Sequence, residues 1–174
     1  MRKLVLYIAV TLDGYIADAS GSVSFLGDLY PDDTFAAFFE TVDALIMGGN
    51  TYRQIVEGRS PERWPYENRK CYVYSGSKSG ISGDVEFTRL PPIVLLERIR
   101  REYSSDIWLV GGGQVARDYL TYDLVDRMIL HIVPKVLGRG ISLFPPGFDT
   151  LDFILVDNKT LSNGLVRLTY ERPR

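Results

Sequence analysis

The chain has 174 residues, of which 45% are hydrophobic and 24% are charged. This composition excludes disordered, collagen-like and coiled-coil proteins, and the length predicts a single domain spanning 1–174. Its 20 basic and 22 acidic residues give a net charge of −2, so we expect no binding to nucleic acid or to a membrane surface. With only one cysteine, Cys71, and one histidine, His131, we expect no disulfide, no metal site and no Cys-His catalytic pair.

The first predicted element is a buried strand at 4–10. Its apolar run is short, and Asp13-Gly14 interrupts it before any signal-peptide cleavage site, so we expect a cytoplasmic protein. Further strand-like runs follow at 44–47, 71–75, 85–87, 107–110, 127–133, 153–156 and 165–170. Helical patterns lie between them at 31–42, 51–57, 92–103 and 113–120.

Strands and helices alternate over the first two thirds of the chain, and the chain then ends in strands alone. This order predicts a three-layer α/β/α fold, with helices on both faces of a mostly parallel sheet and an antiparallel hairpin at its C-terminal edge. Ser162-Asn163-Gly164 is expected to form the hairpin turn, because Asn-Gly tolerates positive φ angles.

The strongest functional signal is Val110 followed by Gly111-Gly112-Gly113-Gln114-Val115, where a strand leads into a helix. Glycines allow a ligand to approach the backbone, and a helix N-terminus offers N–H groups to a phosphate. A tight turn without a ligand is the alternative. A Rossmann domain would carry such a motif on its first strand and an acidic residue about 20 positions later, where this chain has His131. The run therefore predicts a pyrophosphate site in a different α/β fold.

Two neighbouring segments strengthen this prediction. Gly48-Gly49-Asn50-Thr51 also joins a strand to a helix, with Asn50 or Thr51 as the expected N-cap. Two such helix ends on adjacent parallel strands could hold the two ends of one dinucleotide, although ordinary capping explains them as well. Ser75-Gly76-Ser77-Lys78 follows a third strand and offers hydroxyls and a cation to a ribose or its phosphate, or is simply a loop.

Four motifs resemble a known family. They are Thr11-Leu12-Asp13-Gly14-Tyr15-Ile16-Ala17 and the segments 43–52, 110–113 and 133–144. Together they resemble the dihydrofolate-reductase-like superfamily, most closely the branch related to the reductase domain of bifunctional riboflavin-biosynthesis deaminase-reductases. The resemblance covers nearly the whole chain.

The resemblance implies an eight-stranded sheet with NADPH lying across the strand ends, and it suggests a homodimer. Ala9 and Ile16 would flank the nicotinamide, the segments beginning at Gly48 and Ser75 would hold the adenosine side, and the glycine run would hold the pyrophosphate. The implied cofactor-binding residues are Ala9, Ile16, Gly48, Gly49, Asn50, Thr51, Ser75, Gly76, Ser77, Val110, Gly111, Gly112, Gly113, Gln114 and Val115. The family often has arginine where this chain has Gly49.

Asp32 is the candidate catalytic residue, as substrate anchor or proton donor. It lies three residues before Phe35, near the apolar face of the predicted helix, and its position matches the substrate carboxylate of dihydrofolate reductases. An acidic residue in a first helical turn can also serve only the helix dipole. Arg69 resembles the arginine that holds the folate tail, but basic residues before strands are usually just solvated. His131, in mid-strand, is more consistent with a structural role than with catalysis.

These residues predict an NADPH-dependent reductase of a small heterocyclic substrate that is pteridine-, flavin- or pyrimidine-like, resembling 5-amino-6-(5-phosphoribosylamino)uracil reductase. One alternative is a dihydrofolate reductase, which Asp32 and Arg69 favour. Another is a non-catalytic dinucleotide-binding protein that retains the glycine turns without turnover.

Overall fold

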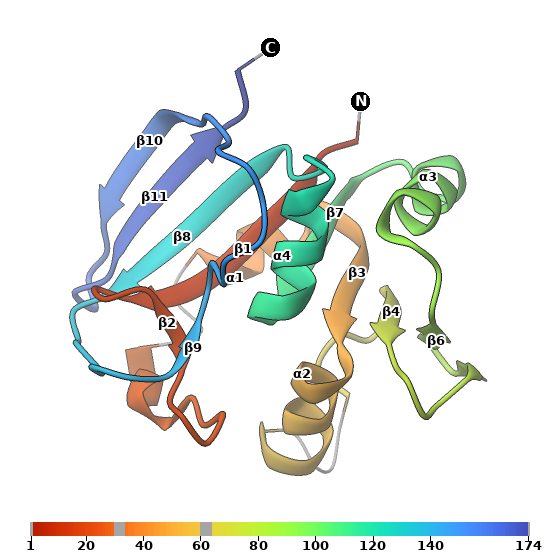
Figure 1. The fold of residues 1–174 in the computed structure, drawn as a ribbon, viewed down its shortest axis with the longest axis horizontal. Helices are drawn as coiled ribbons and strands as arrows, with labels where there is room; N and C mark the ends of the chain where they lie inside the picture. Colours follow the sequence, from red (N-terminus) through yellow and green to blue (C-terminus); the bar gives the residue numbers. More distant parts are fainter. Residues whose placement is uncertain (1, 30–33, 60–63, 174) are drawn as a thin grey trace.

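The computed structural model describes residues 2–29, 34–59 and 64–173. A nine-stranded sheet runs across the molecule in the order β10-β11-β8-β1-β7-β3-β4-β6-β5 (Figure 1). The strands are β1 (Leu4–Thr11), β3 (Val42–Gly48), β4 (Lys70–Tyr74), β5 (Gly80–Ser82), β6 (Val85–Thr88), β7 (Asp106–Gly111), β8 (Arg127–Val133), β10 (Ile154–Thr160) and β11 (Val166–Glu171). A second sheet pairs β2 (Tyr15–Ala17) with β9 (Ile141–Ser142).

Four α-helices complete the layers: α1 (Phe35–Phe39), α2 (Gly49–Gln54), α3 (Pro92–Glu102) and α4 (Gly113–Thr121). A 3₁₀ segment, η1 (Ser24–Leu29), precedes α1, and a π-helical turn, η2 (Ile55–Arg59), extends α2. Across the described ranges, every helix is too short or too polar to pass through a bilayer.

The predicted fold class is confirmed. Six neighbouring strands from β8 to β6 are parallel, and the hairpin of β10 and β11 adds an antiparallel edge. The sheet has nine strands where eight were expected, because Gly80–Ser82 pairs antiparallel with β6. All three residues of this extra strand are exposed, so no apolar pattern marks it in the sequence.

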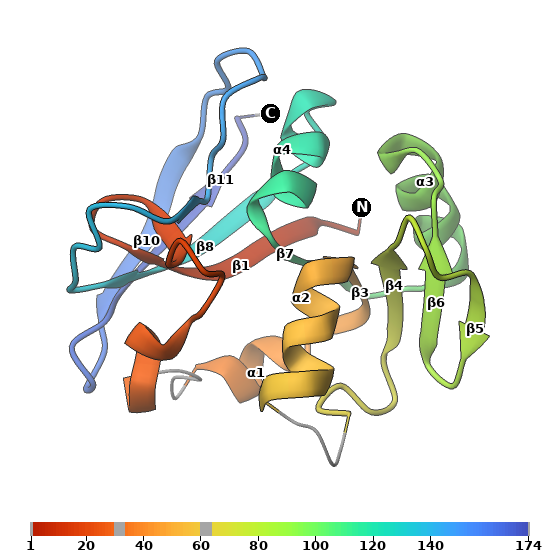
Figure 2. The same ribbon diagram turned by 60° about the horizontal axis from the view of Figure 1, so that its bottom comes forward.

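The central strands are buried on both faces, as crossover connections require. In β1, Leu4 and Leu6 pack toward α3 and α4, whereas Val5 and Tyr7 pack toward α1. Figure 2 shows α3 and α4 on one side of the sheet and α1 and α2 on the other. Alternate side chains of each strand therefore belong to two separate cores.

An aromatic cluster holds α1 to its face of the sheet. Tyr7 stacks on Phe38 with ring centroids 4.1 Å apart, and the edge of Trp108 packs against Tyr66 at 5.3 Å. The indole N–H of Trp108 donates to the Tyr7 carbonyl oxygen over 3.1 Å. This bond satisfies the polar atom of a buried aromatic side chain.

Helix α1 is shorter than predicted. It ends at Phe39, and both the amide and the hydroxyl of Thr41 donate to the carbonyl of Phe38. Val42, expected on the helical face, is instead the first residue of β3 and is 0% exposed. Its helical spacing was therefore misleading, because a buried strand also begins with an apolar residue. The predicted helix start, 31–33, lies outside the described residues.

The C-terminal hairpin turns where predicted. Gly164 has a φ angle of +88°, and the Asn163 side-chain oxygen accepts a bond from the Leu165 amide at 3.2 Å. Strand β10 continues to Thr160, beyond the predicted end at Val156, because backbone pairing with β11 persists after the apolar residues stop.

A charged cluster connects β8, β11 and the residue before β1 near one end of the sheet. Glu171 of β11 accepts from the Lys3 ammonium at 2.7 Å and from Nε of Arg127 in β8 at 2.8 Å. These two hydrogen bonds, the one from Lys3 more than the one from Arg127, hold the pKa of Glu171 below its usual range. The folded protein therefore favours the ionised carboxylate.

We predict that Glu171→Gln lowers the free energy of unfolding by about 1 kcal/mol at neutral pH. Because the folded-state pKa is depressed, the carboxylate stabilises the fold fully above the unfolded value of about 4.3, and this stabilisation is lost as the pH falls through the folded-state value. Urea unfolding at neutral and acid pH measures the difference. Glu97→Gln is the control, since Glu97 pairs with Arg101 only on an exposed helix face; an equal loss in both variants would contradict the prediction.

Candidate functional site

The glycine segments predicted to bind a cofactor meet at one edge of the sheet. Strands β3 and β7 are parallel neighbours that end in Gly48 and Gly111, with Met47 opposite Gly111. On its other side β3 pairs with β4, placing Gly48 opposite Tyr74. Parallel strands end at the same edge, where α/β proteins commonly bind ligands. The three predicted cofactor segments therefore lie side by side.

The reason why glycine occupies the position differs among the three consecutive glycines. Gly111 has a φ angle of +108°, which only glycine adopts readily. A Cβ on Gly113 would lie 2.3 Å from the Ser142 carbonyl oxygen, so packing against β9 requires glycine there. Gly112 has an ordinary φ of −73°, and its Cβ would lie at van der Waals distance from Thr51 Oγ1 and Ile16 Cδ1, 3.5 and 3.6 Å away. The fold itself does not require glycine at 112.

The other pair of glycines is required by close packing. A Cβ on Gly48 would lie 3.1 Å from a methyl of Val115, and one on Gly49 would lie 3.0 Å from the Tyr74 carbonyl oxygen. These contacts bring the start of α2 against the start of α4 and the end of β4.

Both helices begin without a side-chain cap. The N-cap of α2 is Gly48 and that of α4 is Gly112, each with extended backbone. Asn50 and Thr51, the expected caps, lie inside α2, so that prediction was wrong. The reason is that α2 begins at Gly49, directly after β3 ends at Gly48, so no residue stands between strand and helix to serve as a polar cap. The uncapped N–H groups of α4 are the kind of donors that bind phosphate.

Some of the remaining predicted cofactor residues lie beside the glycine turns, and the others lie away from them. Ile16 and Thr51 flank Gly112, and Val115 is 7% exposed beside Gly48. Val110 is half-buried on the aromatic face, and the side-chain amide of Gln114 donates to Asp118 at 2.9 Å on α4. Ala9 lies apart from this cluster: its side chain packs with that of Leu26 and others on the opposite face of β1 from Ile8, whose methyl approaches Gly111.

The loop after β4 is internally ordered. Ser75 Oγ accepts from the Lys78 amide at 2.8 Å and from the Ser77 amide at 3.3 Å. Arg89 donates to the carbonyl oxygens of Ser75 and Gly76 from the other side. The Ser75 hydroxyl oxygen and the amides of Ser77 and Lys78 therefore have fixed positions before any ligand binds.

Three cations surround this loop and the start of α2. The Lys78 ammonium lies over the rings of Tyr52 and Phe87, at 5.4 and 5.5 Å from their centroids. Arg53 donates to the side-chain oxygen of Asn50 at 3.3 Å. Sequence reasoning missed Arg89, because an arginine after a strand has no distinguishing pattern. The backbone bond from Ser75 to Thr88 brings it to the site.

The substrate side is only partly described, since Asp32 lies outside the described residues. His131 is fully buried, and its ring centroid lies 4.7 Å from that of Tyr7. The Arg69 guanidinium lies 5.1 Å from the ring centroid of Phe39 and 3.9 Å from Glu40. Arg69 therefore already has both an aromatic and an acidic neighbour on α1 and just after it.

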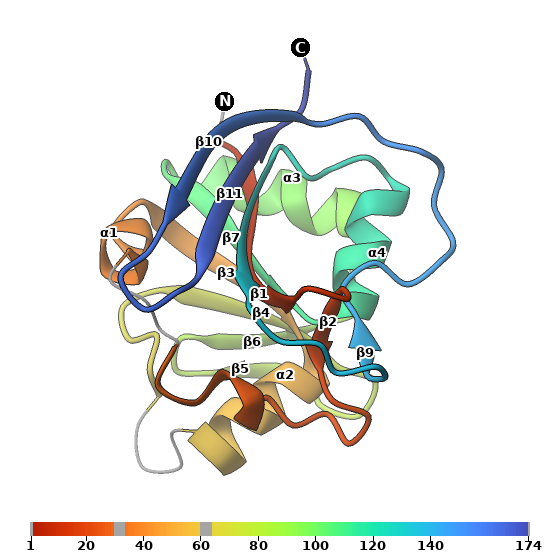
Figure 3. The ribbon, with the colours of Figure 1, turned by 90° about the vertical axis from the view of Figure 1, so that its left-hand side faces the viewer.

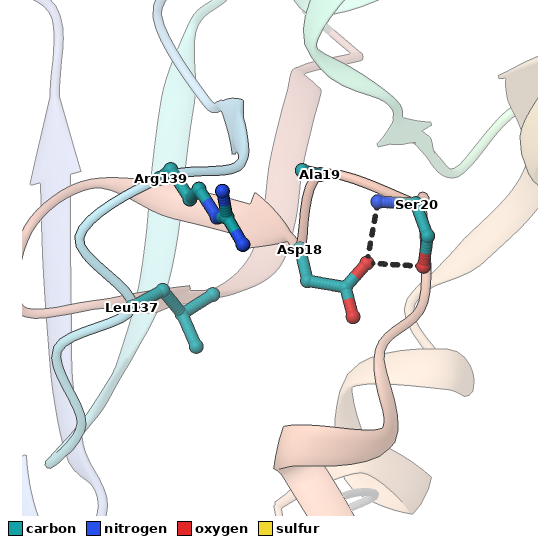
Figure 4. A pocket seen from close by; sticks show the side chains of 5 residues that line it. All are labelled: Asp18, Ala19, Ser20, Leu137 and Arg139. Atoms are coloured by element: carbon teal, nitrogen blue, oxygen red, sulfur yellow. Dashed lines mark hydrogen bonds between the residues drawn. The ribbon is translucent and has the colours of Figure 1, made fainter.

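A hollow of about 280 Å³ opens between two loops (Figure 4). Asp18, Ala19 and Ser20 line it from one loop, and Leu137 and Arg139 from the other. None of the predicted cofactor residues is among them. In the ranges that the structure describes, no group of three His, Cys, Asp or Glu side chains converges to hold a metal ion.

Comparison with known proteins assigns the family. A family model described as the RibD C-terminal domain matches residues 65–167. The chain belongs to this family. It is 38% identical over 146 residues to the uncharacterized protein YwjB of Bacillus subtilis, covering 82% of this chain and 83% of that protein. The predicted resemblance is thereby confirmed.

Solved structures agree with the fold. A putative riboflavin biosynthesis protein from Shewanella sp. PV-4 superposes with a TM-score of 0.85 at 28% identity, with all of both chains covered. Schistosoma mansoni dihydrofolate reductase superposes with a TM-score of 0.68 at 16% identity, covering 99% of each chain. The Thermotoga maritima diaminohydroxyphosphoribosylaminopyrimidine deaminase/5-amino-6-(5-phosphoribosylamino)uracil reductase gives 0.71 at 17% identity, and this chain corresponds to 57% of it. The last two likenesses concern the fold alone.

We predict that Gly112→Val folds but loses affinity for a reduced nicotinamide dinucleotide by at least about tenfold. The reason is that the valine methyls would extend from Cβ into the space beside Thr51 and Ile16. Calorimetric titration measures the affinity, and a thermal melt checks folding. Gly58→Ala is the control, because no atom lies within 4 Å of a Cβ there; unchanged affinity in Gly112→Val would show that the dinucleotide does not approach this turn.

Proposed function

We propose that the chain is an NADPH-dependent reductase of a small heterocyclic substrate. The observation that carries the proposal is Gly112, a glycine whose φ angle and surroundings would accept a side chain. A position that the fold leaves unconstrained, beside the uncapped N-terminus of α4, is consistent with a backbone kept bare for a ligand. Membership of the RibD C-terminal domain family supports a reductase.

The described residues fit a dinucleotide along the edge formed by β3, β4 and β7. The first amides of α4 would bind the pyrophosphate. Ile16 would lie against the nicotinamide end, while Lys78 and the hydroxyls of Ser75 and Ser77 would hold the adenosine ribose and its phosphate. When bound, NADPH supplies the hydride. The protein's contribution is then to align the cofactor with the acceptor and to exclude water.

A pyrimidine-like acceptor is the substrate class that the relatives favour. The Shewanella protein is described as a putative riboflavin biosynthesis protein, and the Thermotoga protein as a 5-amino-6-(5-phosphoribosylamino)uracil reductase. Asp32 is the proposed substrate anchor or proton donor. A carboxylate can hold the amino groups of such a ring or deliver the proton that accompanies the hydride.

The test is cofactor oxidation with a panel of acceptors. The purified protein is titrated with NADPH, and the loss of NADPH absorbance is followed with aminopyrimidine ribosyl phosphates, flavins and dihydrofolate. Turnover with the first class supports the proposal, and turnover with dihydrofolate alone would make the chain a dihydrofolate reductase. Binding of NADPH without oxidation by any acceptor would indicate a non-catalytic binding protein.

We predict that Asp32→Asn lowers kcat by about two orders of magnitude or more while leaving NADPH affinity within about twofold. The amide retains the shape of the side chain but cannot supply the carboxylate charge or its proton. Steady-state kinetics and a cofactor titration of the same preparation measure both quantities. A fall in melting temperature with unchanged kcat would show that Asp32 serves only the helix dipole.

We also predict a modest preference for NADPH over NADH of roughly ten- to a hundredfold, or about 1.4 to 2.7 kcal/mol. Arg53 and Lys78 lie near the proposed position of the adenosine ribose, but position 49 lacks the arginine that would add a bidentate clamp. Because Arg53 is exposed and Lys78 lies on an exposed loop, salt should weaken the preference. Dissociation constants for both cofactors at low and high ionic strength test this, and a preference for NADH would contradict it.

A further inference from the structure

Asp13 belongs to the first motif of the family resemblance, yet it has no part in the proposed chemistry. Although exposed, its carboxylate accepts three strong bonds: from Thr11 Oγ1 at 2.6 Å, from the Gly138 amide at 2.7 Å and from the Leu137 amide at 3.1 Å. Thr11 Oγ1 in turn accepts from the Tyr15 amide at 2.9 Å. An exposed side chain with this many directed bonds has a defined position.

These bonds join two segments that are far apart in the sequence. Residues 11–14 form the last position of β1 and the turn after it, and residues 134–140 follow β8. We call the contact between these two segments the loop junction. The Leu12 amide donates to the Lys135 carbonyl, and the Leu143 amide donates to the Gly14 carbonyl, both at 2.9 Å. The small sheet of β2 and β9 continues the same contact, as Figure 3 shows.

The loop junction extends to the glycine turn of the proposed cofactor site. Cδ1 of Ile16, in β2, lies 3.6 Å from the position that a Cβ on Gly112 would occupy. The carbonyl oxygen of Ser142, in β9, lies 2.3 Å from the position that a Cβ on Gly113 would occupy. A shift of either strand would therefore move an atom that lines the turn. Asp13 is the charged group that connects the two loops at the base of these strands.

We propose that Asp13 is a positioning residue: through the loop junction it holds Ile16 against Gly112, and so shapes the nicotinamide end of the dinucleotide site. This inference rests on the proposed function. Within residues 2–29, 34–59 and 64–173, the hydrogen-bond partners of the Asp13 side chain are Thr11, Leu137 and Gly138, which are not part of the proposed adenosine end formed by α2 and the loop after β4. The two halves of the cofactor should therefore respond differently when Asp13 is changed.

The geometry explains why a carboxylate is needed. One Asp13 oxygen accepts from Thr11, and the other accepts the Gly138 amide. Asparagine could keep the loop amides on its oxygen only with its NH₂ group toward Thr11, whose hydroxyl would then accept instead of donate, and it would lose the negative charge that both loop amides face. The Thr11 hydroxyl and the two loop amides also hold the pKa of Asp13 below its usual range, in agreement with an ionised acceptor.

Asp18 provides a matched control. Its carboxylate also accepts several bonds, from the amide and hydroxyl of Ser20 at 2.8 and 2.6 Å and from the Ser22 amide at 3.0 Å. These partners lie within four residues of Asp18, so they order only its own turn. Asp18→Asn therefore removes a similar charge while keeping Oδ1, which accepts all three of these bonds, so it controls for the loss of charge alone.

The experiment compares the wild type, Asp13→Asn and Asp18→Asn with two ligands, NADPH and adenosine 2′,5′-bisphosphate, by calorimetry. We expect Asp13→Asn to weaken NADPH binding at least about tenfold, while its affinity for the bisphosphate, which lacks the nicotinamide half, stays within about twofold. Asp18→Asn should change neither. If Asp13→Asn does not fold, Asp13→Glu keeps the charge and displaces the carboxylate, and a smaller loss with the same selectivity is expected.

Four outcomes would overturn the inference. Equal weakening of both ligands would show that Asp13 only stabilises the fold, and unchanged binding of both would show that the loop junction does not shape the site. An equal loss in Asp18→Asn would show that the charge of this region, not the connection between loops, matters. If the wild type binds neither ligand, the proposed function fails, and the inference fails with it. The first three outcomes leave the proposed function intact.

Discussion

Close approach of backbone to backbone at the ends of β3 and β7 is the constraint on which the rest of the site depends. A Cβ on Gly48 or Gly49 would press against Val115 or the Tyr74 carbonyl, and one on Gly113 would overlap the Ser142 carbonyl. The absence of side chains at these positions lets the starts of α2 and α4 and strand β9 come this close, and at Gly113 it is indispensable. Packing alone explains those glycines. Gly112 is different, since its neighbours leave room for a methyl group.

The sheet provides the rigid support for this arrangement. Strands β1, β3 and β7 are buried on both faces, in two cores that the sheet separates. On one face the aromatic contacts of Tyr7, Phe38 and Trp108 fix α1. On the other face Ala116 and Tyr119 hold α4 beneath its glycine turn. Backbone groups at the strand ends thus have fixed positions before a ligand arrives, which reduces the entropy lost on binding.

The two ends of the proposed cofactor site are built in different ways. The adenosine end consists of short segments that order themselves locally, through Ser75 Oγ and the cation–π contacts of Lys78. The proposed nicotinamide end lies beside the pairing of β2 with β9, and the carboxylate of Asp13 bonds there to residues 124 and 125 positions away in the chain. Local bonds survive many substitutions elsewhere in a chain. Long-range bonds make one end of the site sensitive to a distant loop.

The sequence by itself determined the fold class, the hairpin turn at Asn163-Gly164 and the strand-to-helix position of the glycine motifs. It could do so because apolar periodicity and glycine conformation act between residues that are close in the chain. It did not reveal strand β5, the end of α1 or the true N-caps, since backbone pairing and competing local bonds decide these. Only the tertiary structure placed Arg89 beside Ser75, Asp13 beside Gly138, and Ala9 on the face away from Ile8 and Gly111. Such contacts join residues far apart in sequence, and their geometry exists only once the strands have assembled.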